Sequence, residues 1–173
     1  LGVIGKPLLV KCEVGQFLPS WRESADYRNS VSAQRKLGGG VLFELSHEID
    51  YLGWIFGKIE WVRATIMQQS SLEIDVEDSA FLTLGIENKA NPNLVANLSM
   101  DFIRHDFQRK CIVIGESGTI KWDGVKQQVS MLKQGESSWT NLLTTNDSSN
   151  DSYLAEWKDF IECLDTKKSP MAT

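Results

Sequence analysis

The stretch GGGVLFELSHEIDYLGW, residues 38–54, decides the fold of this chain. Its three glycines predict a turn, and the following pattern predicts a helix over residues 41–56 that ends at Gly57. At about 100° per residue, the apolar side chains fall on one stripe of that helix. This stripe consists of Leu42, Leu45, Ile49, Leu52 and Phe56. A single apolar stripe packs a helix against a hydrophobic core.

A second stripe lies on nearly the opposite side of the predicted helix and consists of Phe43, His47, Asp50 and Trp54. Because it combines two aromatic rings with a histidine and a carboxylate, we expect it to face a pocket or another domain. A histidine titrates near neutral pH, so His47 can both take and give a proton. Asp50 lies one turn further on, where it either orients the imidazole or caps local donors.

This helix resembles one found in the glucose–fructose oxidoreductase, inositol dehydrogenase and MocA family, where paired glycines precede a histidine and an aspartate follows three residues later. Further segments resemble the family in the same order along the chain: VGQ at 14–16, LPSWR at 18–22, DYR at 26–28, VEDSA at 76–80 and GESGTI at 115–120. The resemblance implies an NAD(P)-dependent sugar or polyol dehydrogenase with an N-terminal Rossmann domain and a C-terminal α+β domain. It also places His47 beside the substrate carbon that exchanges hydride, with Asp50 as a second catalytic candidate.

The helix departs from the family pattern at one position. Dehydrogenases of this group commonly carry an aspartate four residues before the histidine, and here that residue is Phe43. The nearest acid, Glu44, lies about 100° around the helix, so it contacts substrate only after a local backbone adjustment and otherwise is solvated. Glu44 and His47 also suggest a metal site, but such sites on helices need a second Glu-x-x-His copy. Because His105 is the one other histidine, we expect no metal.

The polar segment of residues 16–37 is a long loop, and such loops are often functional. Its candidate substrate-binding residues are Trp21, Arg22, Tyr27 and Arg28. Arginine pairs with phosphate or carboxylate through two hydrogen bonds, and aromatic rings stack on a sugar or base. The alternative is a loop pinned by Trp21, with exposed arginines. The LPSWR and DYR pair resembles a subgroup found with surface-polysaccharide and nucleotide-sugar pathways, which implies a sugar or nucleotide-sugar substrate.

Composition limits the class of protein. The 173 residues are 42% hydrophobic and 24% charged, as in a soluble globular domain with a real core. A net charge of −5 argues against a nucleic-acid surface, and no apolar run approaches the ~20 residues of a membrane span. The three cysteines, Cys12, Cys111 and Cys163, are odd in number and widely spaced. We therefore expect reduced thiols in a cytoplasmic protein.

The sequence lacks the motifs of a dinucleotide site. Such a fold needs Gly-x-Gly-x-x-Gly between a strand and a helix, and the glycine cluster here has Phe43 at the third glycine position. The family's Glu-Lys-Pro motif is also missing, although Gly5-Lys6-Pro7 is superficially similar. We therefore expect residues 1–173 to be a single C-terminal substrate-binding and oligomerisation domain. NAD or NADP would bind the full-length protein through an N-terminal Rossmann domain, and this chain alone would hold no cofactor.

The rest of the chain predicts short strands joined by tight turns. Strands are expected at residues 8–15, 59–68, 79–86, 94–102, 109–114, 119–122 and 125–133, followed by a mobile loop at 137–152. An amphipathic helix at 153–164 carries Leu154, Trp157, Ile161 and Leu164 on one face. These elements predict an α+β fold with an open, mostly antiparallel sheet and helices on one face. The resemblance implies a C-terminal domain like that of dihydrodipicolinate reductase.

Two strands suggest how the chain assembles. Residues 111–114 and 82–84 place apolar or β-branched side chains on both faces of their strands, and such strands are usually buried on both faces. Since the predicted helices cover one side, we expect a homodimer or tetramer formed through the open sheet face, and the family resemblance implies the same pairing. Two alternatives remain: a non-catalytic assembly or partner-binding module, favoured by Phe43, and a metal-dependent hydrolase, based on Glu44 and His47.

Overall fold

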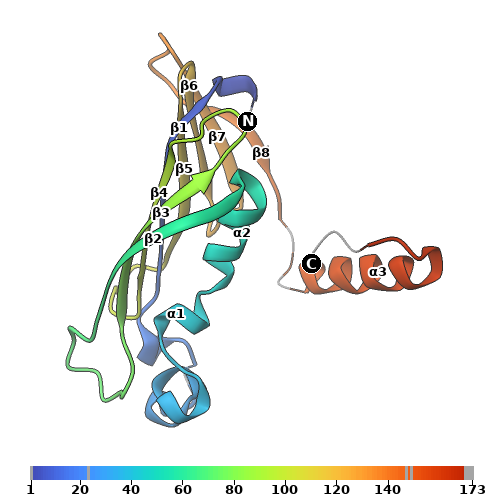
Figure 1. Ribbon diagram of the computed structural model, residues 1–173. Coiled ribbons are helices and arrows are strands. Elements are labelled where there is room, and N and C mark those ends of the chain that lie inside the picture. Colours follow the sequence, from blue (N-terminus) through green and yellow to red (C-terminus); the bar gives the residue numbers. More distant parts are fainter. Residues whose placement is uncertain (1, 23, 147, 149, 170–173) are drawn as a thin grey trace. The chain divides into compact units, whose positions relative to one another are not determined.

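The computed structural model describes residues 2–22, 24–146, 148 and 150–169. The chain forms two compact units, Leu1–Leu143 and Thr144–Thr173. The first unit contains the sheet and two helices, and the second contains one long helix (Figure 1). The fold is α+β with an open, mostly antiparallel sheet, as the sequence predicts.

The sheet has eight strands within the described residues, in the order β2-β3-β4-β1-β5-β6-β7-β8. Their bounds are β1 (Pro7–Gly15), β2 (Lys58–Met67), β3 (Ser79–Glu87), β4 (Leu94–Asp101), β5 (Gln108–Gly115), β6 (Gly118–Asp123), β7 (Gln128–Lys133) and β8 (Thr140–Thr144). The central strands β1 and β4 are parallel, whereas β1–β5, β2–β3, β3–β4, β5–β6 and β6–β7 are antiparallel.

One face of the sheet carries the hydrophobic core, and the helices α1 (Val41–Glu44) and α2 (His47–Phe56) cover it (Figure 1). The strand predicted at residues 94–102 is present as β4, and its alternate residues Leu94, Ala96, Leu98 and Met100 are all buried in this core. From α2, Leu52 and Phe56 add to the same core, with exposed fractions of 0% and 3%.

The single helix predicted over residues 41–56 is wrong, because the helix breaks between α1 and α2. Leu45 has φ −108° and ψ 21°, outside the helical region, and its N–H bonds back to Val41 and Phe43. The N–H of Ser46 then reaches the carbonyl of Phe43, three residues back. This tight turn makes His47 the first residue of a new helix.

Two further predictions need correction. The loop expected at residues 137–152 contains β8, a strand whose residues are all exposed, so no buried alternation marks it in the sequence; positions 147 and 149 lie outside the described residues. The strand expected at 125–133 begins only at Gln128. The N–H of Lys126 bonds to the Asp123 carboxylate, and Gln127 has φ 50°, so residues 124–127 form a turn instead.

The long loop at residues 16–37 is organised by four short 3-10 helices. These are η2 (Leu18–Ser20), η3 (Tyr27–Asn29), η4 (Val31–Ala33) and η5 (Arg35–Leu37); η1 (Gly2–Ile4) precedes β1. In the second unit, α3 (Asp151–Thr166) contains the helix predicted at 153–164. Its apolar side chains Leu154, Trp157, Ile161 and Leu164 are between 49% and 63% exposed.

Candidate functional site

The predicted second stripe lies on the outside of the sheet unit. Phe43 and Trp54 are 72% and 68% exposed, which is unusual for large aromatic side chains. The His47 side chain is 51% exposed, and Asp50 is exposed as well. This surface of α1 and α2 is therefore open to a substrate or to another domain.

A residue that the sequence did not single out lies beneath His47. Glu48 is completely buried, yet its Oε1 accepts a hydrogen bond of 2.7 Å from Nε of Arg109 on β5. The same oxygen lies 3.3 Å from Nε2 of His47. The Arg109 guanidinium sits 5.2 Å from the ring centroid of Trp122, in cation–π contact. One buried carboxylate thus joins the exposed histidine to the sheet.

The sequence does carry one signal for Glu48, which is a large polar side chain beside two apolar core positions. Glu48 stands three residues after Leu45 and four before Leu52, so it borders the apolar stripe. An acid in that position must find a cationic partner or lose its charge. The sequence alone did not reveal that partner, because Arg109 is 61 residues away in the chain.

Two buried thiols lie near this ion pair. Cys12 on β1 and Cys111 on β5 stand directly opposite each other, and all three cysteines of the chain are free. A hydrogen bond with Cys111 lowers the pKa of the Cys12 thiol, and the same bond raises the pKa of Cys111. Burial, followed by the neighbouring thiols, raises the pKa of the Tyr51 hydroxyl on α2, so this phenol stays protonated.

The other acids of the helix differ from Glu48. Asp50 shares a face with His47, but the described residues contain no hydrogen bond between the two side chains. Its N–H bonds to the Ser46 carbonyl at 3.1 Å, as in an ordinary first helical turn. Glu44 is half-buried at the end of α1. Among the described residues no group of three or more histidine, cysteine or acidic side chains is arranged to hold a metal ion.

The glycine turn before α1 serves to bring two loops together. A side chain at Gly39 would overlap the carbonyls of Val31 and Ser32, and one at Gly40 would overlap the Glu77 carboxylate. Oε1 of Glu77 accepts the N–H of Leu42 at 3.2 Å. An acid therefore occupies the helix N-terminus where a dinucleotide fold would hold its pyrophosphate. The residues present here do not fit a dinucleotide phosphate.

The loop candidates surround a small cavity of about 200 Å³. Its lining includes three predicted residues, Trp21, Arg22 and Tyr27, and none of its lining residues belongs to α1 or α2. Trp21 is fixed by a 3.1 Å hydrogen bond from Nε1 to the Gln16 carbonyl and by an edge contact with Phe102. The indole therefore both pins the loop and lines the cavity.

Arg28, the fourth loop candidate, is engaged in ion pairs. Its guanidinium donates to both carboxylate oxygens of Asp26 and, through Nη1, to Glu73 at 3.0 Å. These bonds lower the pKa of Asp26 below its usual value. The hydroxyl of Tyr27 accepts the N–H of Glu73 at 3.2 Å. Tyr27 and Arg28 thus attach this loop to the β2–β3 connection.

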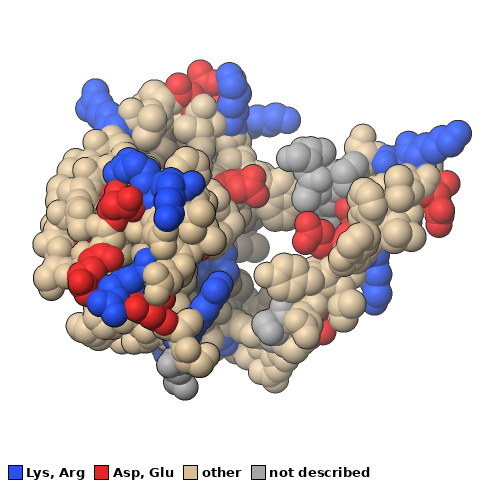
Figure 2. Space-filling model, turned by 90° about the horizontal axis from the view of Figure 1, so that it is seen from below, with Lys and Arg blue, Asp and Glu red and all other residues tan. Residues whose placement is uncertain are grey.

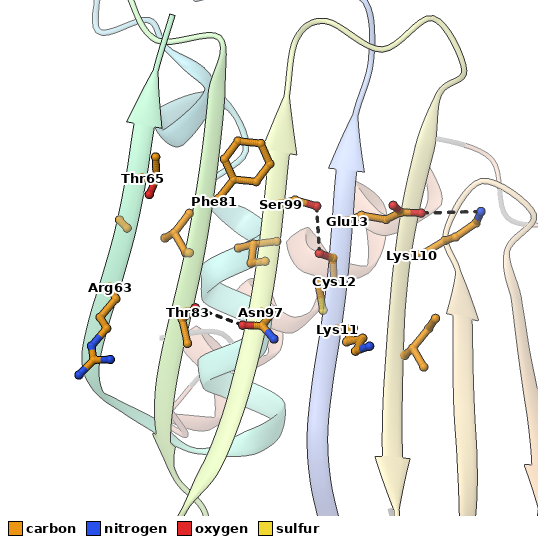
Figure 3. Close-up of a pocket in the computed structure, with 14 residues that line it drawn as sticks. Lys11, Cys12, Glu13, Arg63, Thr65, Phe81, Thr83, Asn97, Ser99 and Lys110 are labelled. Carbon is orange, nitrogen blue, oxygen red and sulfur yellow. Dashed lines mark hydrogen bonds and ion pairs between the residues drawn. The ribbon is translucent and has the colours of Figure 1, made fainter. Parts of the chain in front are cut away.

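The uncovered sheet face holds a shallow groove of about 670 Å³ (Figure 3). Charged and hydroxyl side chains from β1 to β5 point into it, together with Phe81, which is 46% exposed. Glu13 lies 3.9 Å from Lys110, and Thr83 bonds to Asn97 at 3.2 Å. Asn97 is exposed on this outward face of β4, opposite the buried residues of the same strand.

The whole chain, residues 1–173, matches the family model described as "Oxidoreductase family, C-terminal alpha/beta domain", of the Gfo/Idh/MocA group. The chain belongs to this family. The comparison with curated proteins finds no match. The family assignment therefore rests on the full-length match, and it agrees with the resemblance carried by the histidine helix.

Solved structures share the fold of this family domain. UDP-N-acetylglucosamine 3-dehydrogenase GnnA from Acidithiobacillus ferrooxidans is 16% identical with a TM-score of 0.69, covering 98% of this chain and 48% of that one. The WlbA dehydrogenase from Bordetella pertussis, in complex with NADH and UDP-GlcNAcA, is 20% identical with a TM-score of 0.67, covering 98% and 48%. Levoglucosan dehydrogenase in complex with NADH is 16% identical with a TM-score of 0.76, covering 94% and 50%. The chain spans about half the length of these proteins.

The surface of the family domain carries both charges. On the face shown in Figure 2, acidic and basic side chains lie close to one another instead of forming a patch of one sign. The ion pair of Arg28 with Asp26 is one example of opposite charges in contact in this chain. None of the helices described in the structure is long and apolar enough to cross a membrane.

Proposed function

We propose that this chain is the substrate-binding and oligomerisation domain of an NAD(P)-dependent sugar or nucleotide-sugar dehydrogenase, with His47 as its acid–base residue. The observation that carries the proposal is the contact of an exposed imidazole with a buried, ion-paired carboxylate, Glu48. An open surface around this histidine, bearing Phe43 and Trp54, gives a substrate access to it. Full family membership supplies the reaction class.

The chemistry of His47 follows from its surroundings. Oxidation of an alcohol to a ketone releases the hydroxyl proton, and a neutral imidazole within hydrogen-bond reach accepts it. The negative charge of Glu48 stabilises the imidazolium that forms, and the exposed position lets this proton pass on to water. Asp50, on the same helix face, contributes a second acid at the edge of the site. NAD or NADP would supply the oxidising equivalent from a Rossmann domain, since Glu77 occupies the helix end beside the glycine turn.

The loop cavity, of about 200 Å³, is lined by groups suited to one part of a sugar or nucleotide sugar. Trp21 and Tyr27 offer rings for stacking, and Arg22 offers a guanidinium for a phosphate. Arg28 supports this loop through Asp26 and Glu73, and Glu44 is the last residue of α1, three positions before His47. Among the structural relatives, GnnA is named as a dehydrogenase of a nucleotide sugar, and WlbA was solved with a nucleotide sugar bound. Levoglucosan dehydrogenase is named for a sugar.

The test uses the full protein that contains this chain, assayed with NAD⁺ or NADP⁺ against a panel of UDP-sugars and free sugars. His47→Ala should lower kcat by about a hundredfold or more, the range typical of a general acid–base group. Asp50→Asn should cost less, and circular dichroism should show both variants folded. Near-normal turnover by His47→Ala would remove this histidine from the mechanism.

A second function is favoured by one observation: the position at which the family commonly has an acid is occupied by Phe43, which is 72% exposed. In this alternative the domain is a non-catalytic assembly or partner-binding module of a cytoplasmic complex. The same panel separates the two proposals. Absence of turnover for every sugar, in a folded protein that binds dinucleotide and remains oligomeric, would support the assembly module.

A further inference from the structure

We propose that Glu48 is a positioning residue, which fixes the tautomer and orientation of His47 so that Nδ1 faces the substrate. The inference rests on the proposed role of His47, but its geometry stands independently. In a chain that has Phe43 at the family's usual acid position, Glu48 supplies a carboxylate to the imidazole from the inner side of α2.

The first step is that Glu48 is held as a carboxylate. A fully buried acid keeps its charge only when cationic and hydrogen-bonding partners compensate for lost water. Arg109 does so through the 2.7 Å bond from Nε to Oε1. Arg109 is itself fixed, because its guanidinium lies over the Trp122 ring and its carbonyl accepts the Gly124 N–H at 2.7 Å. The carboxylate therefore has a defined position.

The second step concerns the proton on His47. A carboxylate oxygen repels the lone pair of an imidazole nitrogen, and Nε2 of His47 lies 3.3 Å from Oε1 of Glu48, so this contact favours the hydrogen on Nε2. The neutral ring is then the Nε2–H tautomer, and its lone pair is on Nδ1. Because half of the His47 side chain is exposed, Nδ1 is the nitrogen left to take a substrate proton. The arrangement matches the logic of a catalytic histidine held by a buried acid.

The third step concerns how the two oxygens of the Glu48 carboxylate are used. Oε2 of Glu48 is buried and has no hydrogen-bond partner among the described residues. A purely structural ion pair would favour two parallel bonds between guanidinium and carboxylate. Here Arg109 engages one oxygen through Nε, and that oxygen is the one shared with His47. An ion pair that only attached α2 to β5 would not need the same oxygen to contact both Arg109 and His47.

Nitrogen-15 NMR of the imidazole of His47 tests the inference directly, on the 173-residue chain and on the full protein. At a pH where the ring is neutral, the wild type should show the Nε2–H tautomer as the dominant form. Glu48→Met removes the acceptor while keeping side-chain length, and should shift the ring to a mixture of tautomers. Glu60→Met, at an exposed glutamate on β2, should leave the tautomer ratio unchanged.

If Glu48→Met alone does not fold, the double variant Glu48→Met/Arg109→Met removes the unpaired cation and permits the same measurement. An unchanged tautomer ratio in a folded variant overturns the inference. In the full protein, Glu48→Met should lower kcat by at least about tenfold with little change in KM, as expected for an interaction made in the transition state. A tautomer shift in Glu48→Met combined with full activity of His47→Ala would instead overturn the proposed function and leave the positioning contact intact.

Discussion

Nε of Arg109 on β5 lies 2.7 Å from Oε1 of Glu48 on α2, and the carboxylate has no exposed surface. Truncating one member of a buried ion pair leaves the other charge uncompensated, whereas replacing both with apolar side chains is often nearly neutral. A comparison of single and double variants therefore measures what the ion pair contributes to stability, separately from its effect on His47.

We expect Arg109→Met to lower the free energy of unfolding by about 3–5 kcal/mol, because Glu48 would remain buried without a partner. The double variant Glu48→Met/Arg109→Met should recover most of that loss. Urea unfolding of the wild type, Glu48→Met, Arg109→Met and the double variant gives the coupling energy. If the single and double variants are equally destabilised, the pair is not the reason for the loss.

Much of the fold follows from sequence periodicity, as the alternation from Leu94 to Met100 illustrates. The break at Leu45 could not be predicted from periodicity, because a tight turn at one residue leaves the helical spacing of the apolar stripe almost unchanged. β8 has exposed residues throughout, so it lacks the pattern that marks a strand. At the site, the exposure of His47 was predictable, but Glu48 depends on Arg109, which only the folded sheet brings near.

The second prediction concerns dinucleotides. The 173-residue chain alone should show no micromolar binding of NAD(H) or NADP(H) by calorimetry. The reason is that the Glu77 carboxylate accepts the N–H of Leu42 at the N-terminal end of α1 and would repel a pyrophosphate. The full protein, measured in the same buffer, serves as the positive control. Micromolar binding by the isolated chain would place a cofactor site within these residues.

Asp78 provides a pH-dependent prediction. Burial alone would raise its pKa, but hydrogen bonds from Ser70, Gln69 and Ser79 outweigh it and hold the pKa below 3.8. A carboxyl whose pKa is depressed on folding stabilises the protein above the unfolded pKa, and that stability is lost as pH falls through the folded pKa. Asp78→Asn should therefore be less stable than wild type at neutral pH, with the gap narrowing below about pH 4.

Urea unfolding between neutral and acidic pH measures this gap. Asp165→Asn, at an exposed position on α3, is the matched control and should follow the wild type at every pH. A constant difference between Asp78→Asn and wild type across the acid range would show that the ionised carboxylate is not what stabilises the β2–β3 connection.

The fourth prediction separates two arginines of the loop. Arg22 is exposed at the cavity, whereas Arg28 is held by Asp26 and Glu73. If the substrate is a nucleotide sugar, Arg22→Gln should raise its KM by about tenfold, the value of one lost charge-assisted hydrogen bond. The KM for a free sugar, which has no phosphate, should not change. Arg28→Gln should raise KM for both, because it releases the loop itself. Equal effects of the two variants on both substrates would remove the phosphate role of Arg22.

The last prediction concerns assembly through the uncovered sheet face, which carries the groove shown in Figure 3. Phe81 projects there, 46% exposed, and the same groove holds oppositely charged side chains such as Glu13 and Lys110. Phe81 itself stands between Thr65 on β2 and Ser99 on β4. A groove with both an apolar ring and a pair of opposite charges suits a self-complementary interface, in which a two-fold axis brings each patch against its copy. We therefore expect the chain to form a homodimer at micromolar concentration, and the full protein a dimer or tetramer. Phe81→Asp should give a monomer in light scattering, because two copies of the new carboxylate would meet near the axis.

Val125→Asp is the matched control, since Val125 is 45% exposed but lies in the turn between β6 and β7. It should remain dimeric with an unchanged melting temperature. Loss of the dimer only in Phe81→Asp assigns the interface to the sheet face. A wild-type chain that stays monomeric throughout the micromolar range, or a dimer that survives Phe81→Asp, would show that this face is not where the copies meet.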